Sequence, residues 1–232
     1  MHILLTRPLD DSKELILRFT SLGHKVSHLP VINIEPVQYV EPDFSQFEGI
    51  IFTSTNAIKN LNTSKIDKKI QCFCVGNSTE KIAKQSGFQN IFCAEGNVNN
   101  LKEIILQNFD KKGGSLIYIS GELTSYNLEK DLISVGYSVK RLINYTVKPI
   151  EKIRDDFIKD LKSLIPDIVF IYSENSARNF LNILKNYNLQ DEWMKTNLMC
   201  LGERASSVLN EIKWKKIFLF NPGEEEFLLY KI

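Results

Sequence analysis

The chain of 232 residues contains an internal repeat, and this repeat limits its fold more than any other feature. Three segments have partners of similar sequence further along the chain, in the same order. They are residues 22–36 with 135–149, FTSTN (52–56) with IYSEN (171–175), and CVGNS (74–78) with CLGER (200–204). The separation between partners grows slowly along the chain, as expected when insertions collect in surface loops. The three ordered matches indicate two halves of similar architecture that arose by duplication.

Apolar runs rich in β-forming residues recur through both halves. They are HILLT, GIIFTS, IQCFCVG, SLIYIS, DIVFIYS and NLMCLG, each followed by a short polar turn and a helical pattern. Runs that are apolar on both faces are typical of buried parallel strands. Strands that alternate with helices at this spacing predict a doubly wound sheet. We therefore expect two similar α/β domains with doubly wound, flavodoxin-like parallel sheets of roughly five strands each, joined by a two-stranded β linker.

Two extended segments that each contain a proline determine the domain organisation that we expect. They are VINIEPVQYV (31–40) and LINYTVKP (142–149), and neither is followed directly by a helix. We expect them to lie side by side and to cross between the domains. Residues 1–33 and 150–232 then form one discontinuous domain, residues 38–144 form the other, and 34–37 and 145–149 are linker strands. The alternative is a split in sequence order near Lys112-Gly113-Gly114, which is a turn signal.

Composition argues against several classes of protein. Lys and Arg number 29 against 28 Asp and Glu, and the net charge of +1 offers no bulk attraction for nucleic acid or an anionic membrane. No apolar run approaches the ~18 residues of a membrane span, and Asp10-Asp11 stand where the apolar core of a signal peptide would continue. No amphipathic stretch is left over once both cores are filled. We therefore expect a cytoplasmic monomer.

The cysteines and histidines carry no metal or redox motif. Cys72, Cys74, Cys93 and Cys200 form no C-x-x-C pair, and we expect free thiols, with a redox pair at Cys72 and Cys74 as the alternative. Only three histidines are present, and no third ligand has a convincing spacing from His24 and His28. We expect no metal site.

The loops that follow the predicted strands form the candidate binding site, because ligands of open α/β sheets bind beyond the carboxyl ends of the strands. These loops are rich in small hydroxyl and amide residues, which serve first of all as helix N-caps. The free N–H groups of helix N-termini also bind anions. The use of similar loops in both halves favours a cleft between the domains for a ligand with several carboxylates or phosphates. The loops are 6–8, 53–56, 76–79, 120–122, 173–176 and 202–204.

Standard catalytic signatures are absent from the sequence. No G-x-G-x-x-G follows the first strand, and the chain has neither a phosphate-binding lysine loop nor a G-x-S-x-G elbow. An enzyme of this kind would need no cofactor and only modest acid–base help. Tyr145, in the second extended segment, is a neutral proton donor near the expected cleft. Its alternative role is to pack in a β ladder.

The loop motifs together resemble those of a known family. The first strand ends in Thr6-Arg7-Pro8, residues 53–57 match a T-S-x-N-A loop, and residues 75–79 match a V-G-x-x-T loop. Gly121, the stretch from Gly136 to Tyr145-Thr146, Ser173 and Gly202 then follow in the family's order. This ordered set, which covers essentially the whole chain, resembles the uroporphyrinogen-III synthase family.

The resemblance implies a fold, a reaction and a set of site residues. Members have two interleaved α/β domains joined by a β linker. They cyclise hydroxymethylbilane, a linear tetrapyrrole with eight carboxylates, to uroporphyrinogen III, with inversion of the last pyrrole ring, loss of water and no cofactor. The resemblance implies that Tyr145 is the catalytic proton donor of a lyase of heme biosynthesis. It also implies that the substrate is bound by Arg7, Thr53, Ser54, Asn56, Gly76, Asn77, Thr79, Gly121, Ser173, Gly202 and Arg204.

The sequence departs from the family pattern at two loops. Ala205 stands where the family usually has a hydroxyl, although Arg204 is available to hold an anion. The Gly121 loop continues with Leu123-Thr124-Ser125-Tyr126, where a basic residue is common. Glu122, Glu174 and Glu203 add negative charge beside the expected site. The alternatives to the synthase are a catalytically silent two-domain binding module for a small polyanionic ligand and, less favoured for want of phosphate loops, a sugar- or nucleotide-processing enzyme.

Overall fold

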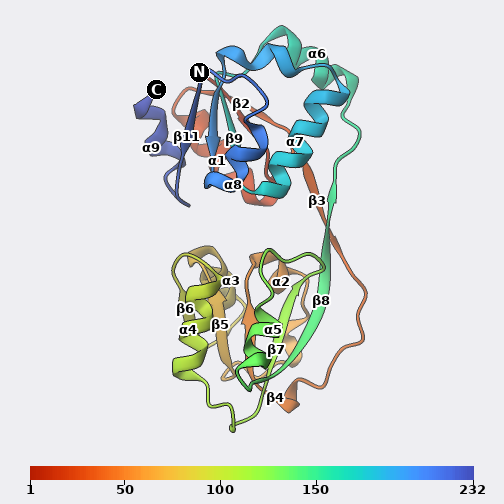
Figure 1. Cartoon of the computed structure of the whole chain (residues 1–232), viewed down its shortest axis with the longest axis vertical. Coiled ribbons are helices and arrows are strands. Elements are labelled where there is room, and N and C mark those ends of the chain that lie inside the picture. Colours follow the sequence, from red (N-terminus) through yellow and green to blue (C-terminus); the bar gives the residue numbers. More distant parts are fainter. The chain divides into compact units, whose positions relative to one another are not determined.

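A computed structural model describes all residues from 1 to 232 and divides the chain into two compact units. Unit 1 consists of Met1–Asn33 and Lys148–Ile232, and unit 2 of Ile34–Val147. The chain therefore leaves unit 1 after Asn33 and returns to it at Lys148. Both ends of the chain lie in unit 1 (Figure 1). The turn at Lys112-Gly113-Gly114 lies inside unit 2.

Unit 1 is built on a five-stranded parallel sheet with the order β11-β10-β9-β1-β2. Its strands are β1 (His2–Leu5), β2 (Lys25–His28), β9 (Ile168–Ile171), β10 (Asn197–Cys200) and β11 (Lys216–Leu219). Its helices are α1 (Leu9–Ser21), α6 (Asp155–Ser163), α7 (Glu174–Asn186), α8 (Glu203–Leu209) and α9 (Glu225–Leu228).

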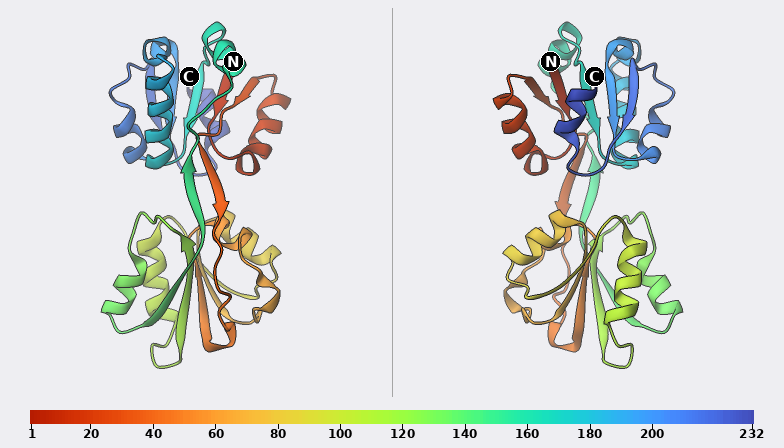
Figure 2. Two further views of the ribbon diagram at one scale, coloured as in Figure 1. Left: turned by 90° about the vertical axis from the view of Figure 1, so that its right-hand side faces the viewer. Right: turned by 90° about the vertical axis from the view of Figure 1, so that its left-hand side faces the viewer.

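Unit 2 is built on a six-stranded sheet with the order β3-β8-β7-β4-β5-β6. The strands are β3 (Ile32–Pro36), β4 (Phe47–Phe52), β5 (Gln71–Val75), β6 (Asn90–Ala94), β7 (Ser115–Gly121) and β8 (Ser138–Pro149). The helices are α2 (Thr55–Lys59), α3 (Asn77–Gln85), α4 (Val98–Asn108) and α5 (Leu128–Ser134). The sheet has one strand more than the sequence predicts, because the extended segment β3 pairs with β8 (Figures 1 and 2).

The two sheets have the same strand order once the extra strand β3 is set aside. The order β2-β1-β9-β10-β11 in unit 1 corresponds to β8-β7-β4-β5-β6 in unit 2. The repeated sequence segments take equivalent places: Ser54 and Ser173 are the N-caps of the helices that follow β4 and β9. Gly76 and Gly202 precede the helices after β5 and β10 with φ of +81° and +86°, a backbone conformation that favours glycine.

Helices cover both faces of each sheet, as the apolar strand sequences require (Figure 1). In β4, Ile50 and Phe52 pack with α2 on one face, whereas Ile51 packs with α4 and α5 on the other. In unit 1, Val169 contributes to the cluster under α7, and Phe170 to the cluster on the opposite face. The predicted pair of doubly wound parallel α/β domains is therefore confirmed. None of the helices combines the length and the apolar character needed to cross a membrane.

All four cysteines are free thiols, and most of them are buried. Burial raises the pKa of both Cys72 and Cys200 to about 12, so these thiols stay protonated at neutral pH. Cys93 is partly exposed, and its pKa is also raised by burial. The thiols therefore act as small apolar core residues.

Candidate active site

Hydroxyl-bearing side chains surround a small cavity at the carboxyl end of the unit 2 sheet. Its volume of about 150 Å³ is below the ~300–1,000 Å³ of typical ligand pockets, so it suits one ring of a larger molecule. None of the lining residues is charged, and all but three of them carry a hydroxyl group. They are Thr53, Ser54, Val98, Tyr118, Gly121, Leu123, Thr124, Ser125, Tyr126 and Tyr145, and we call this space the hydroxyl cavity.

A β-bulge places Tyr145 at the hydroxyl cavity. Ser120 of β7 pairs with Ile143 of β8, but the next residue, Gly121, pairs with Tyr145, so Asn144 is an extra residue in β8. The buried side chain of Asn144 donates a hydrogen bond from Nδ2 to the carbonyl oxygen of Ala57 at 2.7 Å. Helix α2, which contains Ala57, therefore fixes the bulge and with it the position of the tyrosine.

The ring of Tyr145 lies directly against Gly121, which explains why a glycine stands at the end of β7. A Cβ atom on residue 121 would lie 2.7 Å from Cε2 and Cζ of the tyrosine. Only 8% of Tyr145 is exposed. Because the ring is held on one side by the backbone of β7, its hydroxyl group has a restricted position at the cavity.

A second tyrosine lines the hydroxyl cavity and is already hydrogen-bonded within the protein. The hydroxyl of Tyr118 lies 3.0 Å from Oγ1 of Thr53. Burial raises the pKa of Tyr118, so its phenol is neutral at physiological pH. The sequence predicts Thr53 as a substrate contact. Its hydroxyl is hydrogen-bonded to Tyr118, and Thr53 still lines the cavity.

Arg141 of β8 fixes the residues at the end of β7. Its Nε donates to Oγ of Ser120 at 2.8 Å, and its Nη2 donates to the carbonyl oxygens of Gly121 at 2.6 Å and Glu122 at 2.9 Å. The carboxylate of Glu122 accepts a hydrogen bond from the hydroxyl of Thr146 at 2.7 Å. These bonds hold the backbone that carries Gly121 and direct the Glu122 carboxylate toward Thr146.

The remaining predicted residues of unit 2 lie on the loops after β4 and β5. Ser54 lines the hydroxyl cavity and also caps α2, accepting a hydrogen bond from the backbone N–H of Asn56 at 3.2 Å. Asn56, Gly76, Asn77 and Thr79 are not among the residues that line the cavity. Asn77 is exposed and Thr79 is buried in the first turn of α3. Four predicted residues, Thr53, Ser54, Gly121 and Tyr145, are therefore brought together at one cavity.

The predicted residues of unit 1 lie on the equivalent loops of its sheet. The guanidinium of Arg7 lies over the ring of Tyr172, with Cζ 3.9 Å from the ring centroid. Ser173 caps α7 by accepting a hydrogen bond from the N–H of Ser176 at 3.1 Å. Gly202 and Arg204 are exposed at the start of α8. Unit 1 therefore offers Arg7, stacked on an aromatic ring, Arg204, exposed to solvent, and the N-terminus of α7 as groups that can hold an anion.

The family comparison connects these loops to a known group of enzymes. The sequence model of the family described as "Uroporphyrinogen-III synthase HemD" matches residues 13–219, which is most of the chain. The chain belongs to the uroporphyrinogen-III synthase family. The resemblance carried by the loop motifs is thereby confirmed, and the synthase is supported over the silent binding module. A uroporphyrinogen-III synthase is an enzyme of heme biosynthesis whose substrate is a small tetrapyrrole.

Individual relatives and solved structures agree with this assignment. The uroporphyrinogen-III synthase of Chlorobaculum parvum is 22% identical over 223 residues, which cover 90% of this chain and 89% of the relative. The crystal structure of uroporphyrinogen-III synthetase from Helicobacter pylori shares 18% identity with a TM-score of 0.65, covering 100% of this chain and 99% of that chain. A mutant uroporphyrinogen III synthase from Thermus thermophilus shares 14% identity with a TM-score of 0.55, covering 100% and 96%. These two structures support the α/β fold.

Several residues around the hydroxyl cavity of this uroporphyrinogen-III synthase family member are not predicted from the sequence. They are Val98, Tyr118, Leu123, Thr124, Ser125, Tyr126 and the supporting Arg141. In the sequence, Tyr118 resembles an ordinary strand residue, and Arg141 an exposed cation on an edge strand. The polar run from residue 122 to 127, directly after a glycine at a strand end, is the one signal that points to a binding loop.

Proposed function

We propose that this chain cyclises hydroxymethylbilane to uroporphyrinogen III, with inversion of the last pyrrole ring and loss of water, as a lyase that uses no cofactor. The observation that carries the proposal is the position of Tyr145, packed against Gly121 at a cavity of neutral hydroxyl groups. A cavity of about 150 Å³ suits one substituted pyrrole ring. A buried phenol beside such a ring is a suitable proton donor to a leaving hydroxyl group.

In the proposed first step, Tyr145 donates its phenolic proton to the hydroxymethyl group of the bilane. The carbon–oxygen bond breaks, water leaves, and the first ring, which carried the hydroxymethyl group, becomes an electrophilic azafulvene cation. The substituted carbon of the last pyrrole ring attacks this centre to give a spiro intermediate, which reopens and recloses with that ring inverted. The proton released from the last ring on rearomatisation returns to the Tyr145 phenolate, so no proton is gained or lost by the enzyme.

The main contribution of the protein is to hold the chain in the conformation that leads to the type III isomer. The bilane closes unaided to the unflipped type I isomer, so selectivity requires positioning more than activation. We propose that its carboxylates are bound by Thr53, Ser54, Asn56, Gly76, Asn77, Thr79 and Gly121 of unit 2 and by Arg7, Ser173, Gly202 and Arg204 of unit 1. Hydroxyl groups and helix N-termini bind carboxylates without a strongly basic surface, in keeping with a net charge of +1.

We further propose that the enzyme acts as a monomer in the cytoplasm, without a metal, nucleic-acid or membrane partner. The near-zero net charge supports the absence of a nucleic-acid or membrane partner, because binding to polyanions by bulk electrostatics requires a basic surface.

The direct test is to add freshly prepared hydroxymethylbilane to the protein and separate the type I and type III products after oxidation. The proposal predicts that type III is the main product and that its rate of formation rises with protein concentration. A sample of heat-unfolded protein controls for spontaneous closure. Type I alone, formed at the spontaneous rate, would contradict the proposal and would return the silent binding module as the better description.

A further inference from the structure

The wall of the hydroxyl cavity includes a loop whose two ends are fixed very differently. This 122–127 loop connects β7 to α5 and contributes Leu123, Thr124, Ser125 and Tyr126 to the cavity. Its first end is held by the hydrogen bonds of Arg141 to Gly121 and Glu122. Leu123 is 73% exposed, and Thr124 and Ser125 are also exposed. The middle of the loop therefore depends on its ends for its position.

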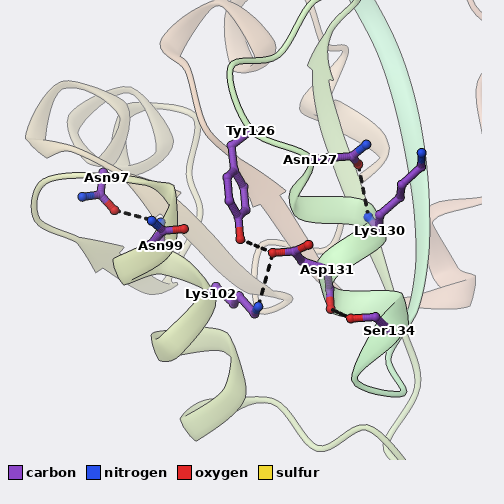
Figure 3. Close-up of polar contacts among 8 residues, drawn as sticks. All are labelled: Asn97, Asn99, Lys102, Tyr126, Asn127, Lys130, Asp131 and Ser134. Atoms are coloured by element: carbon purple, nitrogen blue, oxygen red, sulfur yellow. Dashed lines mark hydrogen bonds and ion pairs between the residues drawn. The ribbon is translucent and has the colours of Figure 1, made fainter. Parts of the chain in front are cut away.

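The second end of the loop is held by three side chains from three different segments (Figure 3). The hydroxyl of Tyr126 donates a hydrogen bond to Oδ2 of Asp131 in α5. Nζ of Lys102, which belongs to α4, lies 3.3 Å from the same Oδ2 atom. Figure 3 shows Asp131 between the tyrosine and the lysine, with Asn127 capping α5 beside them. We call Tyr126, Asp131 and Lys102 the loop anchor.

We propose that the loop anchor positions the 122–127 loop for the cyclisation, so that Leu123, Thr124 and Ser125 enclose the pyrrole ring that reacts at the hydroxyl cavity. This inference rests on the proposed function. Tyr126 belongs to both the cavity wall and the anchor, so its bond to Asp131 transmits the position of α5 to the cavity. Tyr126, Asp131 and Lys102 are thus positioning residues, whereas Tyr145 is the proton donor.

The charges of the anchor suit a substrate with many carboxylates. An unpaired carboxylate near the cavity would repel such a molecule, but Asp131 is bonded on one side to a phenol and on the other to an ammonium group. The hydrogen bond from Tyr126, and then the one from Lys102, lower the pKa of Asp131 below its ordinary value of 3.8. The bond to Asp131 raises the pKa of Tyr126 above 10.0. The lowered pKa of Asp131 and the raised pKa of Tyr126 keep the carboxylate charged and the phenol protonated throughout the neutral range.

Loss of the anchor should weaken substrate binding and isomer selectivity without removing the proton donor. In Tyr126→Phe we expect KM to rise roughly tenfold while kcat stays within about twofold, because the bond serves positioning. We also expect a larger share of the type I isomer, since a loosely enclosed azafulvene can close without ring inversion. Lys102→Met should show the same change in weaker form, and Lys102→Arg, which keeps the cation, should restore the wild-type KM.

The experiment compares these variants with Glu41→Gln, which removes an exposed ion pair of the same unit, between Glu41 and Lys65 at 2.6 Å. Amide hydrogen exchange of residues 122–127 reports the loop directly and should be faster in Tyr126→Phe than in either the wild type or Glu41→Gln. If the wild type makes type III but Tyr126→Phe has an unchanged KM and isomer ratio, the anchor has no positioning role. If the wild type makes only type I, the proposed function itself fails.

Discussion

Replacement of Tyr145 by phenylalanine should lower the rate of uroporphyrinogen III formation about 100-fold, the lower part of the 10²–10⁴ range for a positioned general acid. The phenyl ring can still pack against Gly121, because the Tyr145 atoms nearest to the position of a Cβ on residue 121 are the ring atoms Cε2 and Cζ, which phenylalanine keeps. The variant therefore keeps its fold and loses only the proton donor. Initial rates of type III formation, with thermal unfolding measured alongside, check this expectation.

Tyr137→Phe is the matched control for this variant. Tyr137 is also a buried tyrosine of unit 2, and its hydroxyl donates to the carbonyl oxygen of Phe109 at 3.3 Å, away from the hydroxyl cavity. We expect Tyr137→Phe to change stability slightly and the rate less than twofold. An unchanged rate in Tyr145→Phe would contradict the role of Tyr145 as proton donor and would leave it a packing residue of the β ladder.

The second large effect is expected for Gly121→Ala, which should lower the rate about 100-fold because a shift of ~1 Å in a reacting group costs about that much. The added Cβ overlaps the Tyr145 ring and must displace it, since the neighbouring β7 backbone is held by Arg141. We expect a loss of stability of about 1–3 kcal/mol, the usual cost of overpacking. Urea unfolding and initial rates measure the two effects separately.

A double mutant tests whether Gly121→Ala acts through Tyr145. If the alanine lowers the rate by moving the phenol, it should cost much less in a Tyr145→Phe background, where no phenol remains to be moved. Gly113→Ala is the control, because its Cβ meets only residue Asp110 on the turn before β7. Equal rate losses from Gly121→Ala in both backgrounds would show that the two residues act independently.

The sequence is sufficient to predict the repeated α/β architecture because strand and helix signals are local. The run GIIFTS is apolar on both sides and becomes the central strand β4, with Ile50 and Ile51 buried in opposite faces. The capping role of Ser54 also follows from its place between a strand and a helix. The pairing of β3 with β8 agrees with the expectation that the extended segments 31–40 and 142–149 lie side by side, although the two strands are more than one hundred positions apart. What the sequence does not predict is that β3 adds a sixth strand to the sheet of unit 2.

Loop motifs lead to four of the cavity residues, but the contacts that orient them are long-range. The bulge at Asn144 depends on a bond to Ala57, and the loop anchor joins Lys102 to Asp131 across two helices. Nothing in the local sequence distinguishes Lys102 from the other surface lysines of the chain. Tertiary contacts of this kind decide which hydroxyl groups face the cavity, and only the folded chain brings them together.

The structure also accounts for two of the acidic residues beside the predicted binding loops. Glu122 accepts a hydrogen bond from Thr146 at 2.7 Å, and Glu174 forms an ion pair with Arg178 at 2.6 Å. Both carboxylates therefore have partners within their own unit. This reduces the repulsion that they would exert on a substrate with many carboxylates, although exposed pairs are screened by water and salt.

In the proposed reaction, the reacting pyrrole ring of the substrate binds at the hydroxyl cavity beside Tyr145. A crystal structure with bound uroporphyrinogen III, prepared under reducing conditions, tests this placement most directly. We expect a pyrrole ring of the product between Gly121 and the 122–127 loop, with the Tyr145 hydroxyl within hydrogen-bond distance, about 2.6–3.2 Å, of the product. A product molecule bound elsewhere, with the hydroxyl cavity empty and Tyr145 touching none of its atoms, would contradict the claim.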